Sequence, residues 1–204
     1  MAGEARMFKV ALKAIDALGA EVLPEQLNSI ARTHSILAVG AAIIPVPGAS
    51  EIAGAVNIWY MYKKINNALG IKFSDNKLKT IVGGVVANLG TYALISVGAS
   101  ALLKFIPGLG TVGGTAIDMA LLPAITYTSA FIYLQAICSM AEKAKEGYEN
   151  MSADNLKEEI DDYMKDNKSE IKDVMKDAKK EFKDAKKQYT KEDAKKFAEM
   201  TKDK

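Results

Sequence analysis

Two uncharged runs of 23 residues, at 81–103 and 119–141, constrain this chain more than any other feature. As a helix, each run measures about 35 Å at 1.5 Å per residue, which is enough to cross a hydrocarbon layer of about 30 Å. Eight glycines lie between positions 81 and 118. In a water-exposed helix each costs about 1 kcal/mol relative to alanine, whereas in lipid they permit close helix contact. The runs favour an all-α, membrane-inserted chain, although the buried central helix of a soluble bundle has the same character.

An earlier apolar region, 33–62, is split by prolines into two arms of about 12 and 14 residues, each too short to cross a membrane. We expect these arms to form a hairpin that dips into the bilayer and returns. A second break, FIPGLG at 105–110, separates the two long runs and predicts a second hairpin. The predicted hairpin-turn residues are Pro45, Pro47, Gly48, Pro107, Gly108 and Gly110.

Basic residues flank both predicted hairpins. Between positions 63 and 79 lie five lysines and a single acid, Asp75. By the positive-inside tendency these flanks, and with them both termini, belong on the cytoplasmic side of the membrane. Aromatic residues directly before two lysines are typical of anchors at a membrane interface; the residues concerned are Trp59, Tyr60, Tyr62, Lys63 and Lys64.

Charge is segregated along the chain. Of 52 charged residues 35 lie in 141–204, as 17 lysines and 18 acids. This division predicts three parts: an amphipathic N-terminal helix (1–32), a hydrophobic helical-hairpin membrane domain (33–141) and a charged helical tail (142–204). The net charge of +2 argues against a strongly basic nucleic-acid binder.

Within the N-terminal part, Phe8, Ala11, Leu12 and Ile15 have helical spacing and predict one apolar face. In the tail, Ser152 and Thr190 have the character of helix N-caps.

A heptad repeat in the tail places Met175, Phe182 and Tyr189 on one narrow stripe. This stripe is either part of a solvated, charged helix or an interaction surface for a partner, a second copy or lipid headgroups.

The sequence contains one histidine and one cysteine, which argues against a disulfide scaffold, a zinc site and a histidine-based triad. We expect no cofactor, no metal and no catalytic residues, and therefore a non-enzyme. Glu51, Lys104 and Asp118 are ionisable residues in apolar surroundings. They are candidates for an ion path, or else they cap helices and snorkel to headgroups. Polar residues inside the apolar regions, such as Asn57, Thr128 and Gln135, predict hydrogen bonds between helices or a wet lining.

Several motifs resemble one bacterial family. They are IIPVPGAS at 43–50, LG at 69–70, LKFIPGLGTVGG at 103–114 and AITY at 124–127. Over about residues 30–140 the chain is similar to domain of unknown function six-ninety-seven, the GTPase-associated domain of YcjF-type bacterial membrane proteins. The resemblance implies a protein of the bacterial inner membrane whose GTPase, absent from this sequence, would act in trans.

Together these features predict a self-associating, non-enzymatic membrane scaffold or adaptor, with membrane lipids as partners and the tail as the site of protein interactions. One alternative is an oligomeric pore or ion channel. Another is a soluble helical protein that binds lipid or another apolar ligand.

Overall fold

The computed structural model describes residues 2–44, 49–97, 120–145 and 152–202, and this part is all-α, with no strand. Its helices are α1 (Ala2–Leu18), α2 (Pro24–Ala42), α3 (Ala49–Leu69), α4 (Asp75–Val97), α5 (Leu121–Lys145), α6 (Ala153–Asp166), α7 (Lys168–Glu181), α8 (Ala185–Gln188) and α9 (Lys191–Thr201). The predicted all-α class is confirmed. Among the described residues one helix is long and apolar enough to cross a membrane, and the membrane-inserted hairpins stay a prediction.

Local sequence signals explain several helix ends. Gly19 (φ +63°) follows α1 and Gly70 (φ +72°) follows α3, both in the left-handed conformation that glycine adopts without strain. The N-cap at Ser152 is confirmed, because its hydroxyl accepts from the amide of Asn155. So is the cap at Thr190, which forms a reciprocal capping box with Asp193.

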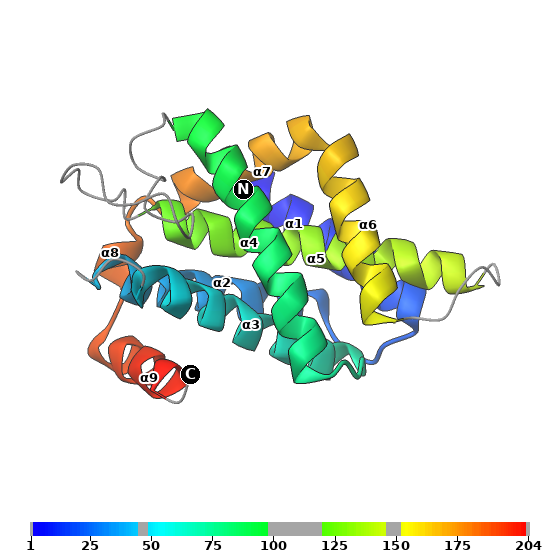
Figure 1. Ribbon diagram of the computed structural model, residues 1–204, viewed down its shortest axis with the longest axis horizontal. Coiled ribbons are helices and arrows are strands. Elements are labelled where there is room, and N and C mark those ends of the chain that lie inside the picture. Colours follow the sequence, from blue (N-terminus) through cyan, green and yellow to red (C-terminus); the bar gives the residue numbers. More distant parts are fainter. Residues whose placement is uncertain (1, 45–48, 98–119, 146–151, 203–204) are drawn as a thin grey trace.

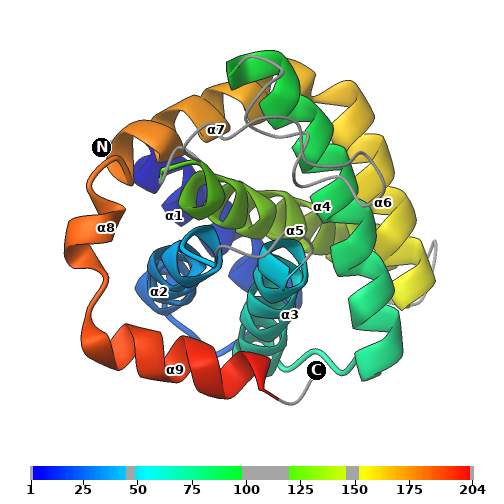
Figure 2. The same ribbon diagram turned by 60° about the vertical axis from the view of Figure 1, so that its left-hand side comes forward.

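Helix α5 lies in the centre of the molecule, with α1, α2, α3 and α4 packed around it (Figure 1). The tail helices α6, α7, α8 and α9 follow one another around this bundle as a belt, which Figure 2 shows from one end. Both α6 and α7 contact α5, while α8 and α9 contact α2. The charged tail is therefore the outer cover of the bundle.

Buried side chains from the N-terminal segment, the apolar middle and the tail form one hydrophobic cluster. The predicted segment boundary at residue 33 lies inside α2. The apolar face of α1 matches the predicted one in part. Ala11 and Ile15 are buried as predicted, whereas Phe8 and Leu12 are 38% and 44% exposed and Met7 and Val10 are buried instead.

Candidate functional site

Helix α5 is the feature on which a membrane function depends. In the described part of the chain it is the one helix long and apolar enough to cross a membrane. Pro123 lies in its first turn, where the missing amide hydrogen costs no intrahelical bond. Within its apolar 18-residue window 94% of the residues are buried inside the protein. The core helix of a soluble protein has the same properties, so the surroundings of α5 decide what it can do.

The charged tail supplies two of the helices that cover α5. Apolar residues at helical spacing form the inner faces of α6 and α7, and they are Leu156, Ile160 and Met164 on α6 and Ile171, Val174, Met175 and Ala178 on α7. The predicted tail stripe is in contact with this core, since Met175 and Phe182 are buried and Tyr189 is partly buried. Its heptads do not form one continuous helix, because α7 ends at Glu181 and α8 begins at Ala185.

Ion pairs connect the tail to the rest of the bundle. Arg32 of α2 pairs with Glu181, whose side chain is only 7% exposed, and the Arg32 guanidinium lies 5.8 Å from the centre of the Phe182 ring. Lys143 of α5 pairs with Glu159 of α6. Pairs of this kind on a surface contribute at most about 1 kcal/mol each. The cover is therefore held mainly by its apolar face, and among the ion pairs of the described residues Arg32–Glu181 has the most buried carboxylate.

Tyrosines anchor α5 to α3. The hydroxyl of Tyr62 donates to the backbone carbonyl of Ser129 at 3.1 Å, and the hydroxyl of Tyr133 donates to Asn66 Oδ1 at 2.7 Å. The rings of Tyr62 and Tyr133 stack with centroids 3.9 Å apart. Buried hydrogen bonds of this type cost free energy when one partner is removed, so they fix the register of α5 against its neighbour.

The sole histidine is part of a buried pair between α2 and α3. His34 Nδ1 donates to Asn57 Oδ1 at 2.8 Å, and Asn57 Nδ2 donates to the His34 carbonyl at 2.8 Å. His34 Nε2 is buried without a hydrogen-bond partner. Burial, opposed by the Asn57 hydrogen bond and assisted by nearby Lys64, lowers the pKa of His34 to about 4. The imidazole is therefore neutral at pH 7 and is held by Asn57, as the polar position of Asn57 predicts.

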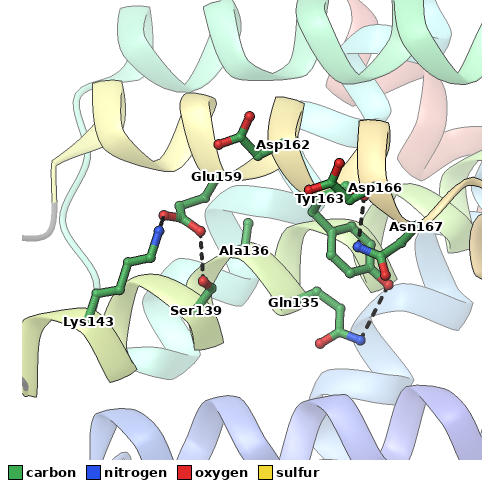
Figure 3. A pocket seen from close by; sticks show the side chains of 9 residues that line it. All are labelled: Gln135, Ala136, Ser139, Lys143, Glu159, Asp162, Tyr163, Asp166 and Asn167. Carbon is green, nitrogen blue, oxygen red and sulfur yellow. Dashed lines mark hydrogen bonds and ion pairs between the residues drawn. The ribbon is translucent and has the colours of Figure 1, made fainter.

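A polar cavity of about 300 Å³ lies between α5 and α6 (Figure 3). Ser139 donates to Glu159 Oε2 at 2.7 Å, and Gln135 donates to the Tyr163 hydroxyl at 3.5 Å. Tyr163 in turn donates to Glu170 at 2.7 Å, and burial together with this bond raises the pKa of Tyr163. Within the described residues no group of three histidine, cysteine or acidic side chains is placed to hold a metal. The cavity marks a polar, less tightly packed part of the α5–α6 contact.

The predicted membrane anchors are described in full, whereas most of the predicted turn and charged residues are not. Trp59 and Tyr62 are in the core and Tyr60 is half-buried, while Lys63 Nζ lies 4.6 Å from the centre of the Trp59 ring and Lys64 is exposed. In this conformation the two buried aromatics pack inside the bundle. Glu51 belongs to α3, but its side chain lies outside the description. The predicted turn residues Pro45, Pro47, Gly48, Pro107, Gly108 and Gly110, with Lys104 and Asp118, lie outside the described residues.

Comparison with protein-family models, with curated proteins and with solved structures gives no match. The resemblance to the GTPase-associated family therefore stays a prediction.

Sequence reasoning missed the contacts that attach the tail. Gly40 of α2 lies directly beneath the aromatic residues of the tail. A methyl group added at Gly40 would come within 2.6 Å of the Phe197 ring and 2.6 Å of the Tyr189 hydroxyl. The sequence gives no sign of this contact, because a single glycine facing a distant aromatic residue creates no periodic hydrophobic pattern. The hydrogen bond that the Tyr127 hydroxyl donates to Asn28 Oδ1, at 2.9 Å, could not be predicted either, because it joins residues 99 positions apart in the sequence.

Proposed function

We propose that the protein is a non-enzymatic membrane scaffold with a closed form and an inserted form. In the closed form, described here, α6 and α7 shield α5 from water. In the inserted form these tail helices withdraw and α5 enters the bilayer. One observation carries the proposal: the helix that could cross a membrane is also the core, and its charged cover is a separate, C-terminal part of the chain.

The energetics favour such an exchange. A bilayer offers α5 the same removal from water that the bundle offers, so leaving the core costs little apolar burial. The helices α6 and α7 are amphipathic and charged, and they suit a membrane surface rather than its interior. The tail can withdraw without breaking the buried hydrogen bonds of Tyr62 and Tyr133, because both join α5 to α3 and neither involves the tail.

A scaffold role follows from what the withdrawn tail would present. The apolar faces of α6 and α7, now packed on α5, would become available to a second copy or to a partner protein. A GTPase acting in trans, which the family resemblance implies, is one candidate partner. The single histidine is buried against Asn57 and unavailable as a general base, which supports a non-enzymatic role.

A reversible lock tests the proposal. Thr128 of α5 and Met175 of α7 are in contact, with Oγ1 and Sδ 3.8 Å apart. In a Cys138→Ala background, which removes the only native cysteine, the pair Thr128→Cys and Met175→Cys is oxidised or joined by a short reducible thiol crosslinker. The protein is then mixed with vesicles, washed with alkaline carbonate and floated.

We expect the locked protein to be washed off and the reduced protein to stay in the vesicles. The single variant Thr128→Cys, treated identically, controls for the substitution and the oxidant. Equal carbonate resistance of locked and reduced protein would contradict withdrawal of the cover. Release of every form into the wash would leave a soluble bundle and overturn the membrane proposal. Light scattering on the detergent-extracted protein tests self-association, for which a defined oligomer is expected.

A further inference from the structure

Folding sorts the charges of the tail in a way that its composition conceals. Along α7, α8 and α9, residues 168–202, eleven of twelve lysines are exposed but only three of eight acids. Four of the other five acids are engaged with the bundle or with the tail itself: Glu181 pairs with Arg32, Glu170 accepts from Tyr163, Asp193 caps α9 and Asp184 pairs with Lys187. Helix α6 is different, with four exposed acids and two exposed lysines. A nearly neutral tail therefore has a basic outer surface confined to α7–α9.

Part of this basic surface lies beside exposed apolar residues. The α8–α9 junction packs on the last turn of α2, where Gly40 lies beneath Tyr189 and Phe197. Three residues further along, Ile43 is 50% exposed, and Ile52 in the first turn of α3 is 62% exposed. Figure 2 shows α8 and α9 curving around the ends of α2 and α3 at this end of the molecule. Exposed lysines line this curve, namely Lys183, Lys186, Lys187 and Lys191.

The combination fits an anionic bilayer better than a nucleic acid. The eleven exposed cations of 168–202 are all lysines, which are point charges without the planar fork that arginine offers to phosphates and bases. The aromatic residues of this stretch, Phe182, Tyr189 and Phe197, are buried or partly buried and so cannot stack on bases. The two large exposed isoleucines would make no favourable contact with a nucleic acid. In proteins that bind a membrane surface, lysines contact the anionic headgroups while neighbouring aliphatic side chains enter the acyl boundary.

We propose that Lys183, Lys186, Lys187 and Lys191, with Ile43 and Ile52, form the docking face by which the closed protein binds an anionic lipid surface. This inference rests on the proposed function and names its partner: the closed protein docks at this end before α5 is released. Four acids lie within two residues of these lysines, and all are engaged. Glu181 pairs with Arg32 and Asp193 caps α9, while Asp184 pairs with Lys187 at 2.8 Å and Glu192 pairs with Lys196 at 2.8 Å. Exposed pairs of this kind break readily.

Vesicle flotation at two salt concentrations tests the face. The full chain is mixed with vesicles of phosphatidylcholine alone or with added phosphatidylglycerol. A variant with Lys183, Lys186, Lys187 and Lys191 changed to Gln is compared with a control in which Lys9, Lys13, Lys157 and Lys165, exposed lysines of α1 and α6, are changed to Gln. Both variants lose four positive charges. Each lysine near an anionic surface raises partitioning by a factor of about five.

We expect the wild type to prefer anionic vesicles and to lose binding as salt rises. The docking-face variant should bind at least about tenfold more weakly, whereas the control should stay close to wild type. Equal losses in both variants would show a net-charge effect and overturn the assignment. Unchanged vesicle binding with weakened binding to polyuridylate would reassign the lysines to a nucleic acid and also overturn it.

A carbonate wash of the same samples separates this inference from the proposed function. Charge-dependent binding that the wash removes completely supports the docking face and contradicts insertion of α5. Carbonate-resistant protein whose binding ignores the lysine substitutions supports insertion and contradicts the docking face.

Discussion

Acidification should destabilise the closed protein through His34. Its pKa is lowered from 6.5 to about 4, chiefly because the ring is buried. A proton added at Nε2 would have no acceptor, because this atom is buried without a hydrogen-bond partner. The unfolded chain binds a proton at pH values where the folded chain does not. The stability that neutral His34 contributes is therefore complete above pH 6.5, declines as the pH falls towards 4, and is fully lost below it.

The size of this effect follows from the shift. A difference of about 2.5 pKa units corresponds to about 3 kcal/mol, at 1.36 kcal/mol per unit. Urea unfolding of the closed protein in buffer, at several pH values between 7.5 and 4, measures it. The control is His34→Gln, which cannot titrate. Other groups titrate equally in both proteins, so the gap in unfolding free energy between wild type and variant isolates His34. We expect this gap to change by about 3 kcal/mol in favour of the variant as the pH falls. A constant gap would refute the reasoning.

Four other substitutions, in two matched pairs, test the packing. Gly40→Ala places a methyl 2.6 Å from the aromatic ring of α9; α9 should undock, which limited trypsin digestion detects as faster cleavage within α9. The matched change Gly83→Ala meets nothing within 4 Å and should stabilise the closed form by up to about 1 kcal/mol in urea unfolding. Tyr133→Phe removes a buried bond to Asn66 and should cost about 1–2 kcal/mol. Tyr60→Phe, at a half-buried position, should cost less; equal losses would contradict the assigned role of the Tyr133 hydroxyl.

Much of the secondary structure could be predicted from local chemistry. The run 119–141 lies almost entirely within α5, and the caps at Ser152 and Thr190 begin α6 and α9. These signals succeed because they act within one or two turns of chain. The run 81–103 predicted the start of its helix less well. Helix α4 is described as Asp75–Val97 and so begins six residues earlier, at a polar first turn that hydrophobicity alone does not reveal.

The position of the tail could not be predicted. An apolar stripe such as that of Met175 and Phe182 indicates that a helix buries one face, but it does not indicate which part of the protein that face packs against. Here that surface is α5, reached through contacts such as Thr128 with Met175, 47 residues apart. An apolar helix likewise has the same sequence whether lipid or protein surrounds it, since both remove it from water. Sequence alone therefore favours insertion without revealing that the chain also provides its own cover.

Depth-dependent quenching shows directly whether α5 leaves this cover for the bilayer. The only tryptophan, Trp59, is changed to Phe, and Phe131 in the middle of α5 is changed to Trp. After its helical content and cooperative unfolding in buffer are verified, the variant is mixed with vesicles whose lipids carry bromine at different depths. The account predicts the strongest quenching by bromines near the bilayer centre. Binding to the vesicles with fluorescence unquenched at every depth would show that α5 stays in the bundle, and would contradict it.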